Sequence, residues 1–154
     1  MYSAESKFID EQIRKLITLE LLMMTNTYNY THIVTEDEID HLNHVNNVVY
    51  VQWIQDISTK HWNDLTANDA DMNYVWVVTR HEIDYKGQAL LGDEITFKTW
   101  VGETSIVTSV RHVEIYKGKK LIVKAATTWC MLHARNLKPA RITESILKVL
   151  EAGK

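Results

Sequence analysis

Hydrophobic positions along the chain predict where its helices lie. Between Asn46 and Leu65, apolar and aromatic residues recur at steps of three and four, the spacing that gives a long helix one wide buried face. Residues 5–24 show the same period. The apolar face of that first helix comprises Phe8, Ile9, Ile13, Leu16, Ile17 and Leu21. A short C-terminal helix is predicted around Ile146 and Leu150, with Thr143 as its cap.

Alternating runs rich in β-branched and aromatic residues predict five strands. The first is Tyr28–Thr35. Four long runs follow the central helix: Val75–Tyr85, Glu94–Val101, Thr104–Tyr116 and Leu121–His133. Gly102-Glu103 and Lys117-Gly118-Lys119 are predicted hairpin turns, which would make the strands on either side antiparallel neighbours. The alternation changes face near Arg111-His112, which predicts a bulge there.

This order of elements predicts an α+β fold. One curved antiparallel sheet wrapped around the long central helix accommodates all five strands. Residues 1–24 are then a helical extension, and residues 25–154 form a single domain. Long strands leave sheet edges that need protection, and pairing two sheets edge to edge would remove one exposed edge per subunit.

Composition narrows the class of protein. The 154 residues are 45% hydrophobic, enough for the core of one domain, and the net charge of −3 gives no basic surface for nucleic acid. No apolar run approaches the ~20 residues of a membrane span, and charged residues interrupt the N-terminal helix, so it is not a signal peptide. The single cysteine, Cys130, predicts a buried thiol and a cytoplasmic protein without a disulfide.

Candidate chemistry lies immediately before the central helix. Asp40 and His44 precede Asn46 and Asn47, which are good caps for a helix N-terminus. The positive end of the helix dipole and the N–H groups near Asn47 and Val48 could hold a developing oxyanion. An acid, a histidine and such N–H groups together suggest acyl transfer or hydrolysis. In the structural alternative, Asp40 caps a turn and His44 binds the loop backbone.

Several residues around the start of the central helix form a specific pattern: His44-Val45-Asn46-Asn47, Tyr50 and Trp53, with Asp40 upstream and Asp56 downstream. This pattern resembles that of the hotdog-fold thioesterases. The similarity is to plastid-type acyl-ACP thioesterases and to 4-hydroxybenzoyl-CoA thioesterase-like acyl-CoA hydrolases, over roughly residues 28 to 145. The resemblance implies a hotdog fold, a dimer or dimer of dimers with sites at the subunit interface, and a catalytic role for Asp40. It also implies that His44 orients this acid or the attacking water.

Some positions depart from the family patterns. Leu42 stands where the plastid-type family has asparagine, and Asn43 where the acyl-CoA branch commonly has glycine. A further family acid would fall near Ala89, with Glu82 and Asp84 as the nearest carboxylates. The sequence therefore contains the complete set of catalytic residues of neither family branch.

Two further residues keep two interpretations each. Tyr50 either contacts the substrate or belongs to the core. The core interpretation follows from its spacing, which is that of the buried helix face. Asp56 faces the site near a partner subunit or faces solvent.

The sequence thus predicts a thioesterase that hydrolyses an acyl-CoA or acyl-ACP to a free acid and a thiol, with no metal or other cofactor. One alternative is a hotdog hydratase or dehydratase acting on hydroxyacyl thioesters. Another is a non-catalytic protein that binds acyl thioesters, in which the loop only caps the helix.

Overall fold

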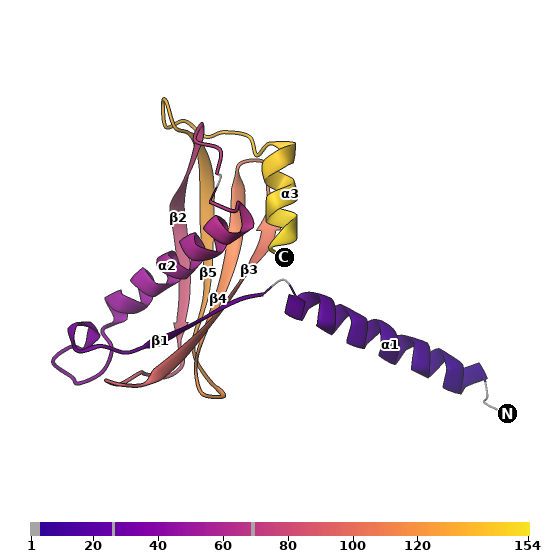
Figure 1. Ribbon diagram of the computed structural model, residues 1–154, viewed down its shortest axis with the longest axis horizontal. Coiled ribbons are helices and arrows are strands. Elements are labelled where there is room, and N and C mark those ends of the chain that lie inside the picture. The colour runs from indigo at the N-terminus through magenta and orange to yellow at the C-terminus, as the bar shows by residue number, and fades with distance from the viewer. Residues whose placement is uncertain (1–3, 26, 69) are drawn as a thin grey trace.

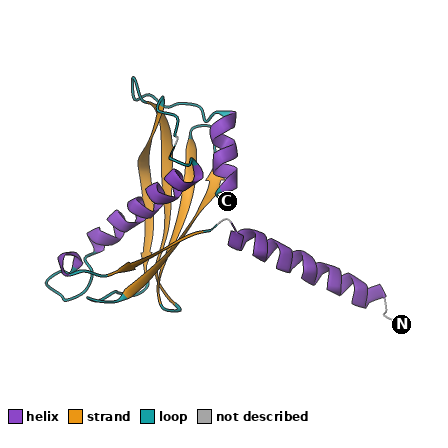
Figure 2. Ribbon diagram, in the orientation of Figure 1, coloured by secondary structure: helices purple, strands orange, loops and turns teal. Residues whose placement is uncertain are grey.

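Five antiparallel strands form one curved sheet, and a long helix lies across one of its faces (Figures 1 and 2). The computed structural model describes residues 4–25, 27–68 and 70–154, so residues 1–3 of the predicted extension lie outside it. The elements are α1 (Ala4–Thr25), β1 (Tyr28–Ile33), the short 3₁₀ helix η1 (Glu36–Glu38), α2 (Asn47–Leu65), β2 (Tyr74–Tyr85), β3 (Glu94–Thr104), β4 (Thr108–Lys117), β5 (Lys120–His133) and α3 (Glu144–Ala152).

The strand order β1-β3-β4-β5-β2 places the first two strands at opposite edges of the sheet. β2 pairs with β5, from Tyr74 opposite His133 to Tyr85 opposite Val123, and β1 pairs with β3. The long helix between β1 and β2 therefore spans the sheet. This is the hotdog fold that the sequence predicts.

Helix α2 is held by its buried apolar face. Tyr50, Trp53, Ile54 and Ile57 pack against inward-facing residues of β3, β4 and β5. The sheet side of this core includes Ile95, Phe97, Val113, Ile115, Ile122 and Val123. Because burying each large apolar side chain contributes about 1.5–3 kcal/mol, α2 cannot shift without losing much of the core.

Helix α3 closes one end of the domain. Ile146 and Leu150 pack with Val101 of β3 in a second apolar cluster. Thr143 caps the helix by accepting the Ile146 N–H, as the sequence predicts. At its other end, a Cβ on Gly153 would lie 2.9 Å from Val101 Cγ2, so only glycine fits this close approach.

One prediction about β3 and β4 is wrong, and a second is confirmed in part. Strand β3 continues through Gly102 to Thr104, so the turn comes later than predicted. Gly102 instead serves a close contact, because a Cβ there would lie 2.6 Å from the ring of His112. The register of Arg111 and His112 with β5 is regular. The pairing of β4 with β3, however, shifts between Val101, which is opposite Arg111, and Thr104, which is opposite Ser109, so an irregularity does lie beside Arg111, with the extra residue on β3. Arg111 is a charged residue on the buried face of β4, and it therefore interrupts the alternation of apolar and polar residues in the sequence.

Helix α1 extends away from the domain (Figure 1). Its apolar side chains Phe8, Ile13 and Leu16 are exposed, and none of residues 6–18, the part of α1 whose side chains the structure describes, belongs to either apolar cluster. None of the described helices is long and apolar enough to cross a membrane.

We expect deletion of residues 1–22 to leave the domain folded, because the described part of α1 contributes nothing to the two clusters. Thermal unfolding followed by circular dichroism should show a cooperative transition near that of the full chain. A truncated protein that melts without cooperativity would mean that α1 belongs to the core.

Candidate active site

Backbone hydrogen bonds close the segment before α2 into a tight loop. The Asp40 N–H donates to the His44 carbonyl at 3.0 Å, and the Asn43 N–H donates to the Asp40 carbonyl at 3.0 Å. Asn43 has a φ of 62°, in the left-handed region that glycine and asparagine tolerate best. Asn43 therefore tolerates the left-handed backbone conformation at the position where the acyl-CoA hydrolases that this sequence resembles commonly have glycine.

The buried backbone of Ala89 fixes this loop to the domain. The Val45 N–H donates to the Ala89 carbonyl at 2.9 Å, and the Ala89 N–H donates to the Tyr50 hydroxyl at 2.9 Å. The loop and the first turn of α2 therefore share one anchor. Ala89 supplies backbone groups where the related pattern has an acid, and the nearby carboxylates Glu82 and Asp84 are on exposed positions of β2.

The fold brings Asp40 and His44 together, as the sequence predicts. Asp40 Oδ1 accepts the Leu42 N–H at 2.9 Å and lies 3.7 Å from His44 Nδ1. Both side chains are mostly covered but still reach solvent, with 16% of Asp40 and 28% of His44 exposed. Within the described chain, Asp40 Oδ2 accepts no hydrogen bond, so one carboxylate oxygen is open to a ligand or a water.

The N-terminus of α2 begins directly after this pair. Asn46 is the cap, and its side chain accepts the Val48 N–H at 3.0 Å. The Val48 N–H, a predicted oxyanion donor, is therefore already occupied. The Asn47 N–H finds no acceptor among the residues that the structure describes, which leaves it as the open donor of the first turn.

Neither Tyr50 nor Asp56 makes a side-chain hydrogen bond to Asp40 or His44 among the residues that the structure describes. Tyr50 is 1% exposed, and its ring packs edge-on against Trp53 and Tyr85, so its contacts are those of a core residue. Asp56 is exposed further along α2, where it accepts a hydrogen bond from Gln52 at 2.8 Å. A role for Asp56 in catalysis would need a second subunit.

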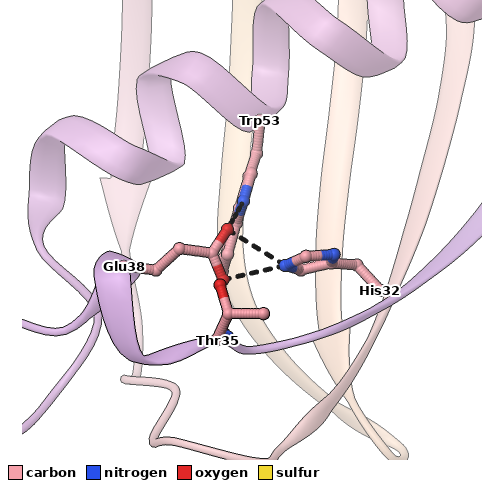
Figure 3. Close-up of polar contacts among 4 residues, drawn as sticks. All are labelled: His32, Thr35, Glu38 and Trp53. Carbon is pink, nitrogen blue, oxygen red and sulfur yellow. Dashed lines mark hydrogen bonds and ion pairs between the residues drawn. The ribbon is translucent and has the colours of Figure 1, made fainter.

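A second acid, Glu38, connects three elements around the loop (Figure 3). Its carboxylate accepts the Trp53 indole N–H at 2.8 Å and the Thr35 backbone N–H at 2.9 Å, and contacts His32 Nε2 at 2.8 Å. Strand β1, η1 and α2 therefore meet at one side chain. The Glu38 carbonyl also accepts the Asn46 N–H, so Glu38 positions the start of the helix as well.

The charge of Glu38 is stabilised by these donors. Burial alone would raise the pKa of Glu38, but the hydrogen bonds from Thr35, His32 and Trp53 outweigh it and hold the pKa below its usual value. A carboxylate with its oxygens so engaged is a poor base, so its role is structural. Sequence reasoning missed it, although Thr35-Glu36-Asp37-Glu38 has the spacing of a capping box.

A groove of about 320 Å³ lies beside Glu38, between α2 and the β1 edge of the sheet. Trp53, Asp56, Lys60 and Tyr30 help to line it, and neither Asp40 nor His44 does. Across the described residues, no three His, Cys, Asp or Glu side chains are placed to hold a metal ion.

We expect Glu38→Gln to lower the stability at neutral pH by about 1–3 kcal/mol, because an amide cannot accept from all these donors. Stability from a carboxyl group with a lowered pKa is present above its ordinary value of 4.5 and is lost as the pH falls through the lower folded value. The variant should therefore lose less stability than the natural protein over that acidic range. Melting temperatures across pH test this.

Glu36→Gln is the matched control, because Glu36 is an exposed neighbour in the same turn of η1. If both variants melt alike at every pH, Glu38 does not hold the loop.

Comparisons with known proteins agree with this fold. Residues 25–150 match the model of the acyl-ACP thioesterase N-terminal domain. A search of curated proteins finds no significant match.

Solved structures with the same fold include YbaW, a probable thioesterase from Escherichia coli (TM-score 0.70, 18% identity, covering 80% of this chain and 96% of that one). A second is Slr0204, a 1,4-dihydroxy-2-naphthoyl-CoA thioesterase from Synechocystis (TM-score 0.69, 15% identity, covering 80% of this chain and 95% of that one). A third is the protein SAV2348 from Staphylococcus aureus in complex with CoA (TM-score 0.74, 16% identity, covering 82% of this chain and 83% of that one). At such identities the likeness shows the fold alone.

The family match spans most of the chain and includes the whole Asp40–His44 loop, α2 and the sheet. The protein therefore belongs to the acyl-ACP thioesterase family of hotdog-fold thioester hydrolases.

Proposed function

We propose that this protein hydrolyses an acyl-CoA or acyl-ACP at the Asp40–His44 loop. The observation that carries the proposal is the half-buried Asp40 carboxylate with one open oxygen, held beside His44 at the N-terminus of a buried helix. The substrate carbonyl would accept the open Asn47 N–H, and the helix dipole would favour the negative charge that develops on its oxygen.

In this mechanism, Asp40 acts on the thioester carbonyl carbon through its open oxygen. It takes a proton from an attacking water or attacks the carbon itself, while His44 keeps the carboxylate oriented. In both cases the carbon–sulfur bond then breaks and the thiolate takes up a proton. When water attacks, the acyl group leaves directly as a carboxylic acid. When Asp40 attacks, an acyl–Asp40 anhydride forms first, and water then hydrolyses it to the free acid and the Asp40 carboxylate. Thiolate is a good leaving group, so the reaction needs no metal ion.

A second copy of the chain would protect the exposed edge of the sheet. β2 is an edge strand of 12 residues without a proline, and its outer backbone groups have no neighbouring strand in one chain. Pairing of two β2 strands would also bring the second subunit toward the start of α2, because the Tyr85 hydroxyl at the end of β2 donates to the Asn47 carbonyl at 3.2 Å.

We expect the active protein to be a dimer or a dimer of dimers. Sedimentation velocity and activity should be measured over the same range of dilution, and both should report the assembled form at working concentrations. A monomer that is folded and fully active would overturn the role of the β2 edge.

We expect Asp40→Asn to reduce hydrolysis at least ~10²-fold, because an amide can neither accept the proton nor attack the carbon. Its size is retained, and it can still accept the Leu42 N–H, so the melting temperature should change little. Release of free thiol from acyl-CoA and acyl-ACP substrates measures the rate.

Asp37→Asn is the control, since Asp37 is an exposed acid three residues earlier, in η1, outside the pair. Near-normal turnover by Asp40→Asn would make Asp40 a structural cap. If that variant loses stability as well as turnover, Asp40→Ser separates the two effects.

A further inference from the structure

A second cavity, of about 270 Å³, lies at the other end of α2 from the Asp40–His44 loop. Ser58 and Trp62 of α2 line one side, Trp76 of β2 another, and Arg111 and Trp129 of the sheet form its floor. Ser58 is 11 residues beyond Asn47, or about 16 Å along the helix axis. The cavity is therefore separate from the proposed catalytic loop.

Arg111 carries an unbalanced charge in this cavity. Its side chain is 6% exposed, and its Nη1 contacts His61 Nδ1 at 2.6 Å. Among the described residues, no carboxylate pairs with Arg111. Burial lowers the pKa of Arg111 to about 10, which still leaves it positive at neutral pH. A buried charge without a counter-ion is strongly disfavoured, so this site favours an anion.

His61 cannot supply that negative charge. Burial, and then the charge of Arg111, lower the pKa of His61 to about 4, so its ring is neutral at physiological pH. It accepts a hydrogen bond from Arg111 through Nδ1 and fixes the direction of the guanidinium group. The remaining N–H groups of Arg111 are left to face the cavity that it lines.

Trp129 gives a second, independent sign of a missing ligand. Its indole Nε1 is buried and has no hydrogen-bond partner. Trp129 on β5 pairs with Ser109, two residues before Arg111 on β4, so Trp129 and Arg111 are diagonal neighbours on the same face of the sheet. A buried N–H without an acceptor costs about 1–3 kcal/mol, which an oxygen ligand would recover.

We propose that this cavity binds the carboxylate of an organic acid. The guanidinium group of Arg111 matches a planar carboxylate with two parallel hydrogen bonds, and the N–H of Trp129, its diagonal neighbour on the sheet, would donate a further one. No acidic residue lines the cavity, and its aromatic walls suit an apolar body attached to the carboxylate. Trp62 and Trp76, with ring centroids 5.8 Å apart, belong to that wall.

The carboxylate has two chemical sources. It belongs either to a free acid, the product class of thioester hydrolysis, or to the far end of an acyl chain that carries a second carboxylate. Both present the same group to Arg111 and Trp129, and the experiments below distinguish them.

The first test measures binding to the full chain by isothermal titration calorimetry, with octanoate and the uncharged octanamide as probes. We expect octanoate to bind at least ~10-fold more tightly than octanamide, because a charged acceptor pairs with Arg111. Arg111→Gln should remove this preference. Trp129→Phe, which keeps an aromatic ring and deletes the N–H, should weaken octanoate severalfold.

Arg80→Gln is the control, because Arg80 is an exposed arginine of β2 that pairs with Glu82. It should bind octanoate as the natural chain does. The proposal is overturned if the natural chain binds octanoate no better than octanamide, or if Arg111→Gln retains the preference. If Arg111→Gln does not fold, unchanged octanoate binding by Trp129→Phe overturns it instead. None of these measurements requires hydrolysis, so their outcome does not depend on the proposed function.

A second experiment assigns the source of the carboxylate. The ratio of kcat/KM for an ω-carboxyacyl-CoA to that for the plain acyl-CoA of equal length is compared in the natural chain and in Arg111→Gln. A lower ratio in the variant supports a carboxylate at the far end of the substrate. An unchanged ratio, with octanoate binding lost, supports a free acid.

Discussion

The packing of α2 against the inner face of the sheet is the constraint on which the rest of the structure depends. Tyr50, Trp53, Ile54 and Ile57 anchor the helix in the apolar core, so its two ends have fixed positions. The N-terminal end meets the Asp40–His44 loop, and the second half meets the cavity around Arg111. A catalytic loop built on such a helix inherits the rigidity of the core, which preorganises its hydrogen-bond donors.

Two acids two residues apart have different environments, and these explain their different roles. The Glu38 carboxylate is engaged by Trp53, His32 and the Thr35 N–H, which stabilise its charge and leave it a poor base. Asp40 accepts one backbone N–H and keeps an oxygen open beside His44. In the proposed mechanism, the first acid holds the loop in place so that the second can act.

The sequence predicted the elements because their periods are strong. The wide apolar face of α2, the caps Asn46 and Thr143, and the turn at Gly118 all follow from local chemistry. Asp40 and His44 could be paired because they lie four residues apart in one loop. Glu38 could not be paired with its partners in this way, because His32 and Trp53 belong to two other elements, 6 and 15 residues away in the chain. The close approach of Gly102 to His112 is likewise a contact between strands that no local pattern reveals.

Thiol release from a panel of acyl-CoA and acyl-ACP substrates, with mass spectrometry of the acyl product, measures thioester hydrolysis itself. We expect free thiol and free acid in equal amounts, because water enters at the carbonyl carbon and the carbon–sulfur bond breaks. An acyl group that gains or loses water while the thioester stays intact would contradict it, and so would a substrate that binds and is returned unchanged.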